Sequence, residues 1–139
     1  MTQEVPDPGS PITDETLVYR WVSRDQIVPD EKLGRYRPST NAFKNTTGTD
    51  SMSVYVEDTL TALGRGPEEF LTDLRAVGSL QTGFLHHECE QAVERSPEVD
   101  EPAHASVVGS DRKGLLKKMA IAACCIESNW ETASGADGG

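Results

Sequence analysis

The sequence predicts a small, single α+β domain in which a mixed sheet is covered by a C-terminal amphipathic helix. Strand-like and helix-like segments follow one another without the regular alternation of a parallel β-α-β fold, which favours the α+β class. Three segments carry this prediction, at residues 17–22, 51–57 and 104–126.

The first two of these segments have the composition and the period of strands. Residues 17–22, LVYRWV, are rich in β-branched and aromatic side chains. Residues 51–57, SMSVYVE, alternate, so that Met52, Val54 and Val56 face one side and polar groups face the other. A period of two predicts a strand with one buried face.

The third segment reads as a strand, a turn and a helix. Residues 104–108 are the strand, Gly109 and Ser110 the turn, and residues 111–126 the helix. An apolar stripe at helical spacing, expected to pack on the sheet, runs through Leu115, Leu116, Met119, Ala122, Ala123 and Ile126.

Weaker patterns fill the rest of the chain. Residues 26–28 either continue the first strand or form a second, short one. The other expected elements are a charged loop at 29–38 turned by Gly34, a short helix at 57–63 ended by Gly64, a second helix at 67–76 opened by Pro67, and a strand at 83–87.

The two ends of the chain are poor in apolar side chains. We therefore predict a disordered segment at 1–15, one folded domain at 16–130 and a flexible glycine-rich tail at 131–139. The tail ends in Gly138–Gly139, the ending that ubiquitin-like carriers use for activation, but a plain glycine-rich tail is the simpler interpretation.

Composition narrows the class of protein. The net charge of −10 makes nucleic acid an unlikely partner, because phosphates would be repelled overall. No apolar run approaches the length of a membrane span, and the polar, acidic start does not resemble a targeting peptide, so we expect a cytoplasmic protein. Three cysteines, two of them adjacent, do not form a secreted disulfide framework.

One candidate site is the start of the last helix. Ten of the 13 basic residues lie in residues 17–45 and 112–118. Arg112 and Lys113 are predicted in the first helical turn, where the backbone dipole disfavours cations. Together with Ser110 they suit a bound phosphate or other anion. The alternative is a solvated basic surface.

The catalytic candidates are Arg20, Ser53 and His104. Arg20 interrupts an apolar strand, so it must snorkel, pair with an acid such as Glu57, or reach an anion. Ser53 shares a strand face with Tyr55 and offers a hydroxyl. His104 follows the acidic loop at 98–102, whose carboxylates can orient it. The alternatives are a structural salt bridge for Arg20 and a hydrogen-bonded strand-end histidine for His104.

The remaining cysteine and histidine residues do not predict a metal site. The residue types that bind zinc occur at His86, His87 and Cys89, and at Cys124 and Cys125. They lack the usual spacing, and no metal is expected. Cys89 beside a histidine also raises the possibility of a thiol nucleophile, although no nucleophile motif surrounds it. No cofactor follows from the sequence.

The segments around Tyr19–Arg20, Arg37–Phe43, Ser53–Tyr55 and Glu101–Gly109 resemble a set of small uncharacterised bacterial proteins that share YR, PSxxAF, SVY and EPAHAxVxG patterns. That resemblance implies no activity. The opening YR strand and the serine strand are also faintly similar to ADP-ribosyltransferase-like and RES-type NAD-processing domains, which use an arginine, a serine and a glutamate.

Two functions remain open at this point. One is an enzyme or binding domain that acts on a phosphorylated small molecule or nucleotide. The other is a non-catalytic module that recognises a protein partner. Convergence of Arg20, Ser53 and His104 in one pocket would favour the first, and separation of these residues would disfavour it.

Overall fold

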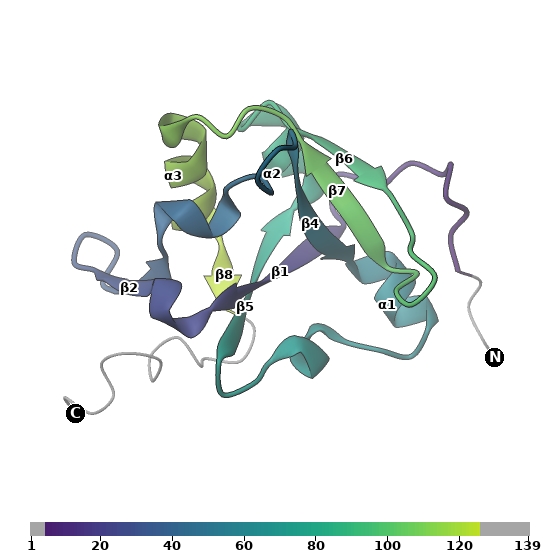
Figure 1. Cartoon of the computed structure of the whole chain (residues 1–139), viewed down its shortest axis with the longest axis horizontal. Coiled ribbons are helices and arrows are strands. Elements are labelled where there is room, and N and C mark those ends of the chain that lie inside the picture. Colours follow the sequence, from purple (N-terminus) through teal and green to yellow (C-terminus); the bar gives the residue numbers. More distant parts are fainter. Residues whose placement is uncertain (1–4, 126–139) are drawn as a thin grey trace.

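The computed structural model describes residues 5–125. The elements follow in the order β1 (Leu17–Ser23), η1 (Arg24–Gln26), β2 (Ile27–Asp30), β3 (Arg35–Pro38), η2 (Thr40–Phe43), β4 (Ser51–Val56), α1 (Glu57–Ala62), η3 (Pro67–Phe70), β5 (Arg75–Gln81), α2 (Thr82–His87), β6 (Ala92–Arg95), β7 (His104–Val108), α3 (Lys113–Ala122) and β8 (Cys124–Cys125), with η marking 3-10 helices (Figure 1).

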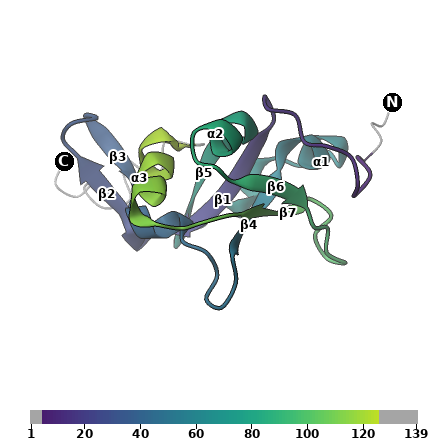
Figure 2. The ribbon, with the colours of Figure 1, turned by 90° about the horizontal axis from the view of Figure 1, so that it is seen from above.

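A six-stranded sheet in the order β6-β7-β4-β1-β5-β8 forms the centre of the molecule. The α+β class and the C-terminal helix are confirmed. The sheet itself is antiparallel at every described pairing and not mixed as predicted. β2 and β3 pair only with each other and form a hairpin that projects from one end of the molecule (Figure 2).

One face of the sheet is the main core. Met52, Val54 and Val56 of β4 are each at most 2% exposed, which confirms the predicted inward face of that strand. They pack with apolar side chains of α2, α3 and η2, and Figure 2 places α2 and α3 on the same side of the sheet. On α3, Leu115, Leu116 and Met119 are buried as the helical stripe predicts, while Ile126 lies outside the described residues.

The opposite face of the sheet carries polar side chains where β4 pairs with β7. In antiparallel strands, directly paired residues point to the same side of the sheet. The pairs Tyr19↔Tyr55, Ser53↔Ser106 and Tyr55↔His104 therefore place two predicted site residues, Ser53 and His104, on this face. A second, smaller apolar cluster of Tyr19, Leu60, Val77 and Ala103 closes one end of the face.

The helix predicted at 67–76 is wrong beyond its first turn. Only Pro67–Phe70 is helical, as η3, and Leu74 is 78% exposed. The chain then enters β5, which pairs with β1 along its whole length. Burial of β5 at the centre of the sheet outweighs the local helical pattern, since Ala76 and Val77 are fully buried there.

Three other predicted elements need correction. Residues 83–87 belong to helix α2 and not to a strand. The loop at 29–38 is the β2–β3 hairpin, with Gly34 at its turn in the left-handed conformation (φ 70°) that glycine tolerates. Helix α3 is shorter than predicted at both ends, because Arg112 is its N-cap and β8 follows Ala123 to pair with β5. No helix among residues 5–125 is long and apolar enough to cross a bilayer.

The N-terminal segment contacts the domain from residue 10 onward. The buried Arg95 donates to the carbonyl oxygens of Ser10 (3.0 Å) and Pro11 (3.2 Å). Ile12 is 8% exposed and belongs to the main core. These contacts argue for a domain that begins near residue 10, whereas the predicted boundary at residue 16 stays a prediction. The predicted tail at 131–139 lies outside the described residues.

Replacing Ile12 tests that boundary. Ile12→Ala should lower the free energy of unfolding by about 2 kcal/mol, because it removes most of a buried aliphatic side chain. Val5→Ala is the matched control, since Val5 is 41% exposed and should be silent. Urea unfolding of the two variants measures the difference in the free energy of unfolding. An Ile12→Ala protein as stable as the parent would support a disordered segment through residue 15.

Candidate functional site

Arg20 lies where the pairing of β1 with β4 ends. That pairing joins Val18 to Val56 and Tyr19 to Tyr55. Beyond it, the Arg20 side chain bridges η2 and β4: its Nε donates to the carbonyl oxygen of Ala42 (2.8 Å) and its Nη1 to that of Ser53 (2.7 Å). The guanidinium is thus fixed by backbone groups.

Arg20 has no carboxylate partner among residues 5–125. The expected pair with Glu57 does not form, because Glu57 accepts instead from the Leu17 backbone N–H (3.1 Å) and the Tyr19 hydroxyl (3.3 Å). Burial lowers the pKa of Arg20, and Tyr55 partly opposes this. A desolvated cation that is held only by carbonyl dipoles gains from an anion placed beside it.

A pocket of about 260 Å³ opens beside this guanidinium. Its lining consists of Arg20, Trp21, Thr46, Ser53 and Tyr55. The lining carries one cation, three hydroxyl groups and an indole, and no carboxylate. Arg20, Thr46 and Tyr55 retain N–H or O–H donors for an anion, whereas the Trp21 N–H donates to Tyr55 and Ser53 Oγ contacts His104.

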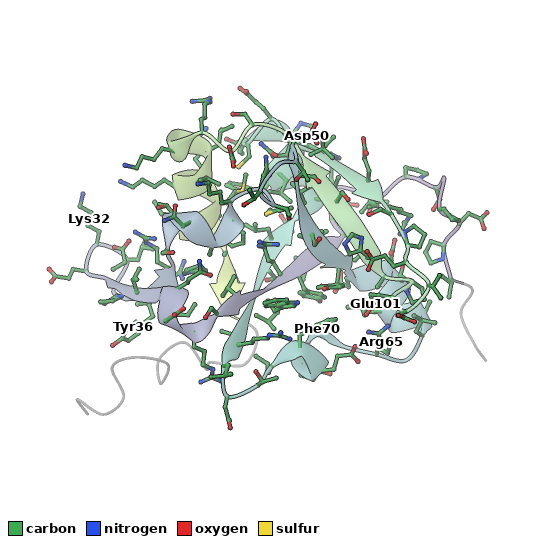
Figure 3. All side chains as sticks on the ribbon, viewed as in Figure 1. Lys32, Tyr36, Asp50, Arg65, Phe70 and Glu101 are labelled. Atoms are coloured by element: carbon green, nitrogen blue, oxygen red, sulfur yellow. The ribbon has the colours of Figure 1, made fainter. Side chains whose placement is uncertain are left out.

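The aromatic wall of the pocket is held in place by stacking. The Tyr55 ring stacks on Phe70 of η3 at 4.5 Å between centroids, and its hydroxyl accepts from Trp21 Nε1 at 3.3 Å. The Arg75 guanidinium lies 3.9 Å from the centroid of the Trp21 ring. Figure 3 shows Phe70 beside this part of the sheet. These contacts keep the Tyr55 hydroxyl oriented at the pocket.

His104 joins Ser53 to a line of hydrogen bonds across the polar face. Its Nε2 lies 3.0 Å from Ser53 Oγ, and its Nδ1 lies 2.9 Å from Ser96 Oγ and 3.0 Å from the Ser96 carbonyl oxygen. Ser96 Oγ in turn contacts Ser106 Oγ at 3.0 Å. The side chain of His104 is only 12% exposed, so these partners define its orientation.

The Ser96 carbonyl fixes the tautomer of His104. A carbonyl oxygen only accepts, so we assign the ring proton of the neutral imidazole to Nδ1. Nε2 is then the acceptor, and the hydroxyl of Ser53 donates to it. Glu98 is the nearest carboxylate, with Oε2 3.9 Å from Nε2, in agreement with the expectation that the acidic loop approaches this histidine.

The acidic loop before β7 is anchored by an ion pair. Arg65 donates to both carboxylate oxygens of Glu101, at 2.7 and 2.6 Å, and Figure 3 shows the two side chains together. Arg65 holds the pKa of Glu101 below its ordinary value. The anchor fixes the entry into β7 and therefore the position of His104.

Comparison with protein-family models, with curated proteins and with solved structures finds no match to this chain.

The predicted anion site at α3 is not part of this pocket. His104 is the first residue of β7, and Ser110 lies beyond the last residue of that strand. The two are about 20 Å apart along the extended chain. Ser110, Arg112 and Lys113 are exposed. The Ser110 hydroxyl already accepts the Arg112 backbone N–H at 3.2 Å, and Arg112 is the N-cap, outside the first turn where it was predicted.

The histidines and cysteines considered for a metal do not gather. His86 and His87 both contact Asp14, at 3.4 and 3.0 Å, and residues 5–125 contain no group of three or more metal-ligating side chains. Cys89 is fully buried in the core, and burial raises the pKa of its thiol, which disfavours the reactive thiolate.

Arg20 and Ser53 therefore line one pocket, His104 contacts Ser53 without lining that pocket, and Ser110, Arg112 and Lys113 lie elsewhere. Thr46 and Ser96 were missed by the sequence analysis. Both lie in polar loop or strand-end segments, where an isolated serine or threonine carries no signal of its own, and only the tertiary fold places them at the site.

Proposed function

We propose that the chain binds a small molecule through a phosphate or carboxylate group held in the Arg20 pocket, with a nucleotide or another phosphorylated metabolite as the class of ligand. One observation carries the proposal: a desolvated guanidinium without a carboxylate partner among the described residues lines a pocket that is otherwise furnished with hydroxyl groups. Two of the five N–H groups of Arg20 reach backbone carbonyls, so others remain for an anion.

Size and charge support a small anionic head group. A volume of about 260 Å³ lies just below the range of pockets that enclose a drug-sized ligand, so a larger ligand would extend outside. The net charge of −10 repels extended polyanions, whereas a single recessed cation attracts one anionic group locally. A cytoplasmic location, where phosphorylated metabolites are abundant, fits this proposal.

Calorimetric titration with inorganic phosphate, acetate and adenosine monophosphate tests the pocket. Arg20→Lys should weaken binding at least tenfold, because lysine keeps the charge but loses the planar fork of donors. Tyr55→Phe should also weaken it, since the variant keeps the stack on Phe70 and loses only the hydroxyl.

The double variant Arg112→Ala, Lys113→Ala is the matched control, because it removes two cations outside the pocket. It should bind like the parent. If the double variant loses binding while Arg20→Lys keeps it, the start of α3 is the anion site. If the parent binds none of the three ligands at millimolar concentration, the proposal is refuted.

The projecting β2–β3 hairpin favours a protein-interaction module as the second candidate. Leu33 at its turn is 38% exposed, and pockets of about 550 and 360 Å³ adjoin the hairpin, both lined by Pro29, Asp30 and Glu31. Affinity capture with the parent and with a Leu33→Asp variant tests this role. A protein retained only by the parent would support it, and identical captures would oppose it.

A further inference from the structure

We infer that Ser53 is a nucleophile activated by His104, and that the chain transfers or hydrolyses the acyl group of an ester that carries an anionic group. The inference rests on the proposed function for its choice of substrate, because Arg20 supplies the contact to that anionic group. The Ser53–His104 contact itself is an independent observation.

Three features of the pair are those that nucleophilic catalysis requires. Ser53 Oγ lies 3.0 Å from Nε2, within reach of direct proton transfer. The Ser96 carbonyl accepts from Nδ1–H at 3.0 Å, and so fixes the tautomer in which Nε2 is the base. Ser53 also lines the pocket, so a substrate bound there lies next to this residue.

Ser51 offers a comparison with Ser53 within the same strand. Ser51 lies on the same strand and the same face, and it has no hydrogen bond from its side chain among the described residues. The sheet therefore does not require a bonded hydroxyl at these positions. Ser53 differs from Ser51 in being placed diagonally across from the histidine, and its backbone carbonyl accepts from Arg20.

The reaction balances with water as its co-reactant. The Ser53 Oγ–carbon bond forms as its proton moves to His104 Nε2, and the negative charge develops on the ester carbonyl oxygen. The hydroxyls of Thr46 and Tyr55 line the same pocket and can donate to this oxyanion. The carbon–oxygen bond to the alcohol then breaks, and Nε2 returns the proton to the departing alkoxide. Water, deprotonated by Nε2, next cleaves the acyl-serine and restores the enzyme.

A fluorophosphonate probe tests the nucleophile directly. In that reaction the Ser53 Oγ–phosphorus bond forms, fluoride leaves, and the proton goes to Nε2. The full-length parent should be labelled at Ser53, as located by peptide mass spectrometry. Ser53→Ala should abolish labelling and Ser51→Ala should retain it. His104→Gln should slow labelling about 100-fold, the usual contribution of a general base.

The mapping on the parent needs no variant, so the test does not depend on whether a variant folds. No labelling, labelling at another residue, or labelling of His104→Gln at the parental rate would overturn the inference. Calorimetry of the parent with inorganic phosphate, acetate and adenosine monophosphate reports on the Arg20 pocket alone. Labelling without binding of any of the three ligands would retain the nucleophile and refute the anion pocket, and binding without labelling would do the reverse.

Discussion

Met119→Asp is expected to unfold the domain. Met119 is 2% exposed on the buried face of α3 and packs in the main core between the helix and the sheet. Truncating a buried methionine costs about 2–5 kcal/mol, and a carboxylate buried there without a partner adds a further desolvation cost. The sum approaches the whole stability of a domain of this size, about 5–15 kcal/mol.

Ile121→Asp is the matched control for this change. It introduces the same side chain on the same helix, at a position that is 36% exposed. Circular dichroism should show a cooperative thermal transition for the control and no such transition for Met119→Asp. A Met119→Asp protein that melts at the parental temperature would mean that α3 does not pack on the sheet through this face.

Elements whose signal is local were predictable from the sequence. β4 is the clearest case: its alternation fixed both the strand and its buried face, because a strand with one solvated face must alternate. The stripe on α3 is the helical equivalent. In both, the residues that make the pattern are the residues that are buried.

The failures have a common cause. The strand predicted at 83–87 is helix α2, and β5 was not predicted, because the helix expected at 67–76 overlaps only its first two residues. The sequence RAVGSLQ has little alternation, since β5 is buried on both faces between β1 and β8. A strand of that kind cannot be distinguished from a buried helix by periodicity alone.

Half of the candidate site was predictable for a physical reason. Arg20 is a cation in an apolar strand, and a cation in that position needs a hydrogen-bond or ionic partner. The sequence indicates that such a partner exists but does not identify it. His104 and Ser53 follow from strand faces once β4 and β7 are neighbours. The anion site at α3 stays a prediction: Lys113 begins the helix as expected, whereas Arg112 is the N-cap and not part of the first turn.

Asp58→Ala should destabilise the domain by about 3 kcal/mol, the lower end of the range for breaking a buried ion pair, because it leaves the Arg95 charge without its counter-ion. Arg95 donates to Asp58 at 2.9 and 2.6 Å, and its side chain is 6% exposed. Arg95→Met should cost less. It leaves Asp58, which is 31% exposed, able to meet water.

The same pair predicts how stability depends on pH. Burial of Asp58 by itself would raise the pKa of its carboxyl, but the hydrogen bonds and charge of Arg95 outweigh it and hold the pKa below the ordinary value. An acid whose pKa is lowered in the folded state stabilises that state when the pH is above the unfolded pKa of about 3.9. This stabilisation is lost as pH falls through the folded pKa. Urea unfolding of the parent and of Asp58→Ala should therefore differ most near neutral pH, and the difference should shrink as pH falls through the folded pKa of Asp58. Other acids titrate in both proteins, including Glu101, so the difference between the two curves isolates Asp58. A difference that stays constant from neutral to acid pH would show that the carboxylate charge of Asp58 does not stabilise the fold, and that its contribution comes from packing alone.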